Sequence, residues 1–205
     1  MNLRKFRSTQ RETASKLCRA ASLAFALTAN YPASAQQVTG PEIARSVKSS
    51  LFVKTSGSLD PISSRILEIH NEARLAVGAP PLKWDPELTA HAMVYAQTLA
   101  RSGQLVHSPR EGRGAERENL TEAFHGSSPD QLMHYWLIEK RDFHNGVFPN
   151  VCKGDWEQCA HYTQVIWPTT TYVGCGLVPG VQWDFFVCRY SPGGNKDGKP
   201  VGLIN

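Results

Sequence analysis

The apolar positions of this chain recur at helical spacing in three segments that open with the same signal. Asp60, Asp85 and Ser128 are each followed directly by a proline. Asp and Ser are favoured helix N-caps, and proline is favoured at the first helical position. Apolar residues then recur three or four positions apart, which predicts three helices, the first stopped by Gly78 and the second ending near Gly103.

The pattern changes to alternation in the last third of the chain. Residues 172–178 and 183–190 alternate well enough to predict an antiparallel hairpin about Gly180. The earlier run 159–167 is rich in β-formers and predicts a strand with His161 at its start. Helices early and strands late, without βαβ alternation, predict an α+β fold built on an antiparallel sheet.

The first 35 residues have the pattern of a secretory signal peptide. Six basic residues precede the apolar run 20–29, and the small residues Ala33, Ser34 and Ala35 follow it, which places the cleavage site after Ala35. A signal anchor is disfavoured because this run is far shorter than the ~20 residues that a membrane span needs. We therefore expect an exported chain without a transmembrane anchor. Its expected parts are a signal peptide (1–35), a flexible lead-in (36–59), one folded domain (60–198) and a tail (199–205). The end of the domain, from Ser191, and the tail are expected to have no regular secondary structure.

Removal of the signal peptide changes the charge balance. The whole chain has a formal net charge of +4, from 22 Lys and Arg against 18 Asp and Glu. Residues 1–35 hold six of the basic residues and one acidic residue, which leaves 16 basic and 17 acidic residues and a net charge of −1. The exported part therefore gives no electrostatic support for nucleic-acid binding.

Four cysteines remain after the signal peptide: Cys152, Cys159, Cys175 and Cys188. An even number in an oxidising compartment predicts two disulfides, with three possible connectivities. We favour Cys152 with Cys159, which bracket a short loop, and Cys175 with Cys188, which lie on the two hairpin strands. A zinc-binding cysteine set is the alternative, and the spacings do not favour it because none is CxxC-like.

Seven short motifs occur in one order between residues 62 and 196. They are His70-Asn71-x-x-Arg74, Leu82-x-Trp84, His107-Ser108, Glu118-Asn119-Leu120, Trp136-x-x-Glu139, His161-Tyr162-Thr163-Gln164-x-x-Trp167 and Cys188-Arg189-Tyr190-x-Pro192-x-Gly194-Asn195. This set resembles the CAP superfamily, also called SCP-domain proteins. The superfamily comprises cysteine-rich secretory proteins, antigen-five proteins and plant class-one pathogenesis-related proteins. The resemblance implies an α-β-α sandwich with a central antiparallel sheet, and we expect a bacterial-type exported member.

The resemblance also implies an open cleft lined by two histidines and two acids. Carried over by position, these are His107, His161, Glu118 and Glu139. In the family a divalent metal such as zinc can sit on the two histidines, and the acids orient the site. Two imidazoles are fewer than the three protein ligands of most catalytic zinc sites, so a weak metal site is expected. Arg117 stands where the family usually has glycine, and a guanidinium there would lower the pKa of Glu118 or cover the cleft mouth.

Three functions are compatible with these residues. The favoured one is a secreted or periplasmic monomeric module, more non-enzymatic than catalytic, that binds a lipid, a sterol, or an envelope or host-surface partner in its cleft. The second is a metal-dependent hydrolase, a peptidase or esterase, that uses the four cleft residues, with Ser108 beside His107 as a disfavoured nucleophile. The third is a purely structural wall-associated domain. The remaining histidines are expected to be structural or solvent-exposed, with His70, Asn71 and Arg74 forming a packing network.

Overall fold

The computed structural model describes residues 58–202, so the predicted signal peptide and most of the lead-in lie outside the described residues. The three helices expected from their capping signals are present as α1 (Pro61–Leu75), α2 (Pro86–Ser102) and α3 (Pro129–Leu137). The side chains of Asp60, Asp85 and Ser128 accept hydrogen bonds from the backbone N–H groups of the first turns. Each helix start is therefore determined by residues that are adjacent in the sequence.

A four-stranded sheet forms the centre, in the order β1-β4-β5-β2. The predicted hairpin is confirmed as β4 (Tyr172–Pro179) and β5 (Asp184–Ser191), which pair antiparallel. The edge strand β2 (Arg117–Ala123) pairs antiparallel with β5, and the short β1 (Lys83–Trp84) pairs parallel with β4. A second, two-stranded sheet joins β3 (Gly146–Val147) to β6 (Pro200–Val201).

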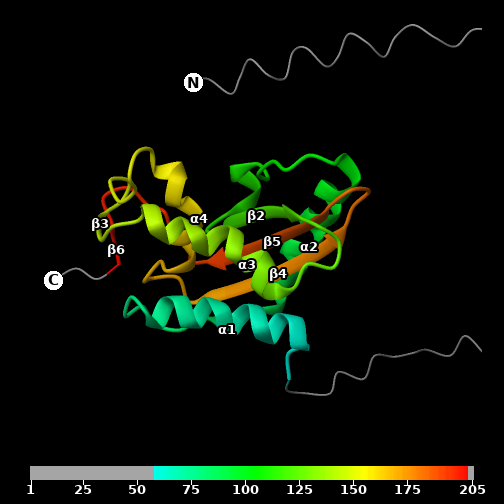
Figure 1. The fold of residues 1–205 in the computed structure, drawn as a ribbon, viewed down its shortest axis with the longest axis horizontal. Helices are drawn as coiled ribbons and strands as arrows, with labels where there is room; N and C mark the ends of the chain where they lie inside the picture. Colours follow the sequence, from blue (N-terminus) through cyan, green and yellow to red (C-terminus); the bar gives the residue numbers. More distant parts are fainter. Residues whose placement is uncertain (1–57, 203–205) are drawn as a thin grey trace, which may run out of the picture. The chain divides into compact units, whose positions relative to one another are not determined.

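The helices cover both faces of the central sheet (Figure 1). Helix α2 packs on one face, where its alanines and Leu99 form an apolar cluster with Phe185 and Val187. On the other face, Phe186 and Tyr190 share a larger core with residues of α1, α3 and α4 (Ala160–Val165). Alternate residues of β5 thus face opposite helical layers, as a strand requires. The α+β class and the α-β-α sandwich are confirmed.

Close approach of α2 to the sheet depends on two glycines of β4. A Cβ atom at Gly174 would overlap backbone atoms of Asp85 and Thr89, and one at Gly176 would overlap Met93. The helix backbone therefore lies directly on this strand. Within residues 58–202, none of the helices is both long and apolar enough to cross a membrane.

The structure differs from the sequence-based expectations in three places. The run predicted as a strand headed by His161 is the short helix α4, preceded by the 3-10 helix η5 (Trp156–Cys159). Strand β2 was not among the elements that the sequence pattern predicted. The charged segment before it holds the 3-10 helix η3 (Arg110–Arg113). The end of the chain, expected to be irregular, contributes β6, whose Val201 is fully buried.

Candidate functional site

The first half of the site joins the loop before η3 to strand β2. Nδ1 of His107 donates a hydrogen bond to Oε1 of Glu118 over 2.8 Å. Ser108 donates twice to the same carboxylate, from its backbone N–H to Oε1 at 2.7 Å and from its hydroxyl to Oε2 at 2.9 Å. The Glu118 side chain is fully buried, whereas that of His107 is 54% exposed. The buried carboxylate therefore orients an imidazole that faces solvent.

The charge of Glu118 is balanced from the neighbouring strand. Arg189 of β5, its cross-strand partner, places Nη2 3.0 Å from Oε2, and Arg113 lies 3.7 Å from Oε1. Burial works to raise the pKa of Glu118, but the His107 hydrogen bond, the Arg189 charge and the Ser108 bonds together hold that pKa below its ordinary value. Glu118 is therefore ionised at neutral pH and acts only as a hydrogen-bond acceptor.

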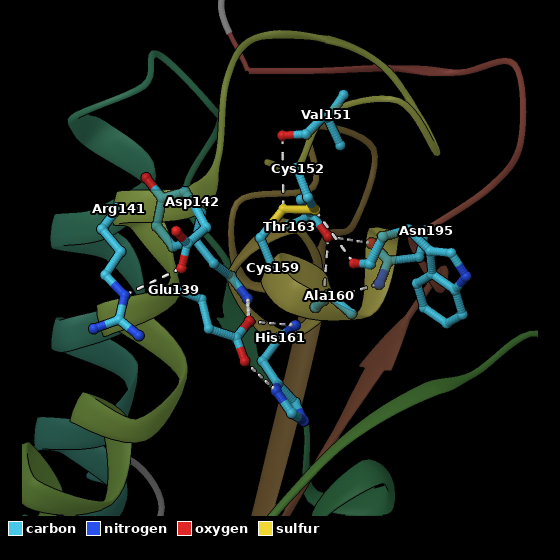
Figure 2. Close-up of a disulfide and its surroundings, with 12 residues drawn as sticks. Glu139, Arg141, Asp142, Val151, Cys152, Cys159, Ala160, His161, Thr163 and Asn195 are labelled. Carbon is cyan, nitrogen blue, oxygen red and sulfur yellow. Dashed lines mark hydrogen bonds and ion pairs between the residues drawn. A yellow bond between two sulfur atoms is a disulfide. The ribbon is translucent and has the colours of Figure 1, made fainter. Parts of the chain in front are cut away.

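The second half of the site is the pair His161 and Glu139. Nδ1 of His161 donates to Oε1 of Glu139 at 2.6 Å, as Figure 2 shows. Glu139 lies on the 3-10 helix η4 (Ile138–Asp142), directly after α3. Its Oε2 accepts the backbone N–H groups of His161 and Tyr162 at 2.9 and 3.1 Å. One carboxylate thus binds the first turn of α4 and fixes the imidazole of that turn.

Two further contacts hold α4 in place. The disulfide between Cys152 and Cys159 ends directly before the helix (Figure 2), and Nδ2 of Asn195 donates to the carbonyl of Ala160 at 2.9 Å. The other disulfide joins Cys175 to Cys188 across β4 and β5. These are the two pairings that the cysteine spacing favours. Because six residues make only a short helix, α4 depends on these contacts more than on local propensity.

Asn119 connects the two halves. Its Nδ2 donates to the backbone carbonyl of His161 at 3.1 Å and to the Tyr190 hydroxyl at 3.3 Å. That hydroxyl lies 2.9 Å from Nε2 of His70, whose Nδ1 donates to the carbonyl of Ile66 at 2.8 Å. The position of α4 is therefore tied to the residue next to Glu118 and, through it, to the core.

A cavity of about 690 Å³ contains three of the four expected residues. His107 and Glu118 lie in its lining together with His161, whereas Glu139 supports His161 and is not part of the lining. The other residues that line it are Arg110, Arg113, Arg117, Asn119, Phe148, Pro149, Trp156, Glu157, Ala160, Asn195 and Asp197. The structure thus brings the two histidines to one cleft from distant parts of the chain.

Sequence reasoning missed Arg189, and the structure gives Ser108 and Arg117 definite places near Glu118. Arg189 follows Cys188 in a quoted motif, but nothing in the sequence pairs it with a residue about 70 positions earlier. Ser108, considered as a nucleophile, donates its hydroxyl to Glu118 and accepts from Arg189. Of the two roles expected for Arg117, lowering the pKa of Glu118 falls to Arg189 instead, whereas Arg117 lines the cleft.

The donor set can be tested for a metal. Because Nδ1 of each ring faces a carboxylate oxygen, the tautomer that donates this bond has its proton on Nδ1 and leaves Nε2 as the atom able to bind an ion. A histidine that donates its other N–H to a carboxylate is the usual arrangement around protein metals. Among residues 58–202, however, no three His, Cys, Asp or Glu side chains are grouped to hold an ion. The donor chemistry thus offers two imidazoles in one cavity lining, and an ion held there would need water or ligand atoms to complete its coordination.

The other histidines lie outside this arrangement. Burial lowers the pKa of His70 to about 4, so this ring is neutral within the network that also includes Asn71 and Arg74. Arg74 donates to backbone carbonyls of residues 80, 165, 167 and 170, and Asn71 bonds the backbone of Leu82. The expected packing network at the first helix is confirmed.

Comparison with known proteins assigns the fold to a family. The family described as "CAP: Cysteine-rich secretory protein family" matches residues 67–190. Pathogenesis-related leaf protein 4 of Solanum lycopersicum is 37% identical over 137 residues, which cover 65% of this chain and 79% of that protein. Pathogenesis-related protein PR-1 of Medicago truncatula is 41% identical over 135 residues, which cover 63% and 72%.

Solved structures agree at the level of the fold. A structure of NaASP2 with Zn²⁺ superposes with a TM-score of 0.61 at 22% identity, covering 73% of this chain and 91% of NaASP2. The structure of BmVAL-1 gives a TM-score of 0.58 at 20% identity and covers 74% and 86%. The matched residues, the two-layered helical cover of the sheet and the sequence identity to plant relatives lead to one conclusion: this chain belongs to the CAP, or cysteine-rich secretory protein, family.

Proposed function

We propose that this chain is an exported, non-enzymatic module that binds an amphiphilic ligand, a lipid or a sterol, in the cleft between His107 and His161. The observation that carries the proposal is the cavity itself, because its lining combines apolar and polar groups. Phe148, Pro149 and Trp156 line it together with the two histidines and several charged residues. An apolar lining with a few placed polar groups is typical of small-molecule sites.

A divalent metal such as zinc is a second part of the proposal. His107 and His161 would hold it through Nε2, with Glu118 and Glu139 orienting the rings. A bound ion would supply positive charge to an oxygen atom of the ligand. Two protein ligands make this a weak site, whose occupancy depends on pH and on the ligand.

Export and the absence of catalysis belong to the same proposal. The basic and apolar pattern of residues 1–35 and two disulfides support an oxidising compartment, either the periplasm or the medium. Against the hydrolase alternative, the Ser108 hydroxyl is held between Glu118 and Arg189, with no imidazole bonded to it in the described part of the chain. It is therefore not arranged as an activated nucleophile.

Lipid extraction of the purified protein, followed by mass spectrometry, tests the proposal. We expect a lipid or sterol to copurify with the natural protein and to be depleted in an Ala160→Trp variant, which fills the cleft. Val181→Trp, on the highly exposed turn between β4 and β5, is the matched control. Equal lipid content in all three proteins would contradict the proposal, and EDTA-sensitive turnover of peptides or esters that Glu139→Gln abolishes would favour the hydrolase.

A further inference from the structure

Three arginines line one wall of the cleft. Arg110 and Arg113 belong to η3, and Arg117 begins β2, so a segment of eight residues brings three guanidinium groups to the cavity that holds both histidines. Three cationic side chains in the lining of one cavity call for an explanation.

These arginines are only partly compensated within residues 58–202. Arg110 donates to the carbonyl of Gly114 at 2.9 Å, and Arg117 makes neither a side-chain hydrogen bond nor an ion pair there. The side chain of Arg113 is nine-tenths buried, its distance to Glu118 is 3.7 Å, and its buried Nε has no hydrogen-bond partner. Burial and the charges of Arg110 and Arg113 lower the pKa of Arg117. An anion would stabilise these neighbouring cations, and above all the buried Nε of Arg113.

The Arg117 side chain is held in position by its neighbours. A Cβ atom at Gly193 would overlap Cγ of Arg117, so the loop after β5 lies directly against the stem of this arginine. The N–H of Gly193 also donates to the carbonyl of Ala115 at 2.8 Å, which fixes that loop to the segment before β2. Arg117 is therefore held as part of the cleft wall.

The other lining residues define the rest of the ligand. Phe148, Pro149 and Trp156 supply apolar surface, and the exposed acids Glu157 and Asp197 also lie in the lining. Glu118 compensates Arg113 only in part, over 3.7 Å, because it is already bonded to Arg189, His107 and Ser108. A lining that combines three arginines with apolar side chains suits an amphiphile with an anionic head.

We propose that Arg110, Arg113 and Arg117 bind the phosphate group of a phosphate ester in this cleft. Guanidinium groups present N–H pairs that match phosphate oxygens in two-point contacts, which makes arginine the preferred residue for this anion. This inference rests on the proposed function, because it names the head group of the ligand that the cleft would take. It does not depend on the metal, and its test is made in EDTA.

Calorimetric titration of the purified protein with sn-glycerol 3-phosphate, with glycerol as the neutral probe, tests the site. We expect the phosphate ester alone to bind, more weakly at high salt because charges at an open cleft are screened. Arg110→Gln/Arg117→Gln should weaken binding about 100-fold, since each charged hydrogen-bonding group contributes about tenfold. The double variant Arg65→Gln/Arg101→Gln removes the same charge outside the cavity and should bind normally. Asp197→Asn should bind more tightly, because it removes a carboxylate from the lining.

The source of the phosphate is distinguished by sedimentation with vesicles. Loss of binding to phosphatidic acid vesicles, but not to phosphatidylcholine vesicles, in Arg110→Gln/Arg117→Gln would identify a lipid head group. Binding of glycerol 3-phosphate without sedimentation would identify a soluble ester. The inference is overturned if glycerol 3-phosphate does not bind, or if the cleft double variant and the control double variant bind it equally. A copurifying neutral lipid that Ala160→Trp depletes would then still support the proposed function, whereas failure of both tests rejects both.

Discussion

The carboxylate of Glu139 binds His161 at two places, the ring through Oε1 at 2.6 Å and the backbone N–H through Oε2 at 2.9 Å. It therefore acts both as a cap for the first turn of α4 and as the group that sets the direction of the imidazole. A single side chain links the folding of this turn to the chemistry of the cleft.

Replacing Glu139 with glutamine should affect stability and metal binding together. The amide keeps one acceptor but directs an NH₂ group at an N–H donor, so we expect a loss of about 1–3 kcal/mol in the free energy of unfolding. Zinc affinity should fall about 10–100-fold, as for other residues that orient metal-binding histidines. Urea unfolding and calorimetry measure the two effects. Glu157→Gln is the matched control, because this exposed acid lies in the cleft lining without bonding His161.

Breaking the buried ion pair of Glu118 should cost more unfolding free energy than breaking an exposed ion pair. Arg189 is 7% exposed and Glu118 is fully buried, so Arg189→Gln leaves a buried carboxylate poorly compensated. We expect a cost of about 3–5 kcal/mol in unfolding free energy. Arg65→Gln breaks the exposed pair with Asp130 and should cost no more than about 1 kcal/mol. Equal costs in denaturant unfolding would show that Arg189 does not compensate Glu118.

His70 predicts a pH dependence of stability. Its pKa is about 4 in the folded protein, against an ordinary value of 6.5, because burial disfavours the charged ring. Between these values the unfolded chain binds more protons, so the free energy of unfolding should fall by about 3 kcal/mol as pH drops from 6.5 to 4. Above pH 6.5 this group has no effect. Chemical unfolding across this pH range should give a flatter profile for His70→Gln, and an unchanged one for the exposed control His134→Gln. Parallel profiles for His70→Gln and the natural protein would exclude His70 as the source.

The two disulfides should be similar for stability but different for the site. Removing either by serine replacement opens a short loop, of sequence separation 7 or 13, and should cost about 2–3 kcal/mol. Only Cys152→Ser/Cys159→Ser releases the start of α4, so only this variant should also weaken zinc binding at His161. Cys175→Ser/Cys188→Ser is its control, because β4 and β5 remain paired by their backbones. Equal zinc affinities in the two variants would show that the disulfide does not position α4.

Local signals were sufficient for the three long helices and the hairpin. Asp60, Asp85 and Ser128 cap their helices with their own side chains, and β4 and β5 are rich in the aromatic and β-branched residues that favour strands. Such features depend on neighbours in the sequence, and therefore appear in its pattern.

Long-range contacts explain why the sequence pattern did not predict strand β2 and helix α4. Strand β2 has the sequence of a charged loop. Its Glu118 can be buried because Arg189, on the neighbouring strand β5, compensates the charge of the carboxylate. Helix α4 reads as a strand because Tyr, Thr, Val and Ile favour strands, whereas Glu139 and the Cys152 disulfide impose the helical turn. The family motifs named His107, His161, Glu118 and Glu139 as site residues, and the function of that set remains a prediction.

Titration of the protein with Zn²⁺ by calorimetry, without a polyhistidine tag, tests the central claim most directly. We predict one weak site in the natural protein, weakened by His107→Ala or His161→Ala and abolished in the double variant. His134→Ala, on the exposed side of α3, should bind as the natural protein does. Unchanged zinc binding in the His107→Ala/His161→Ala variant would contradict the claim that these two imidazoles form one site.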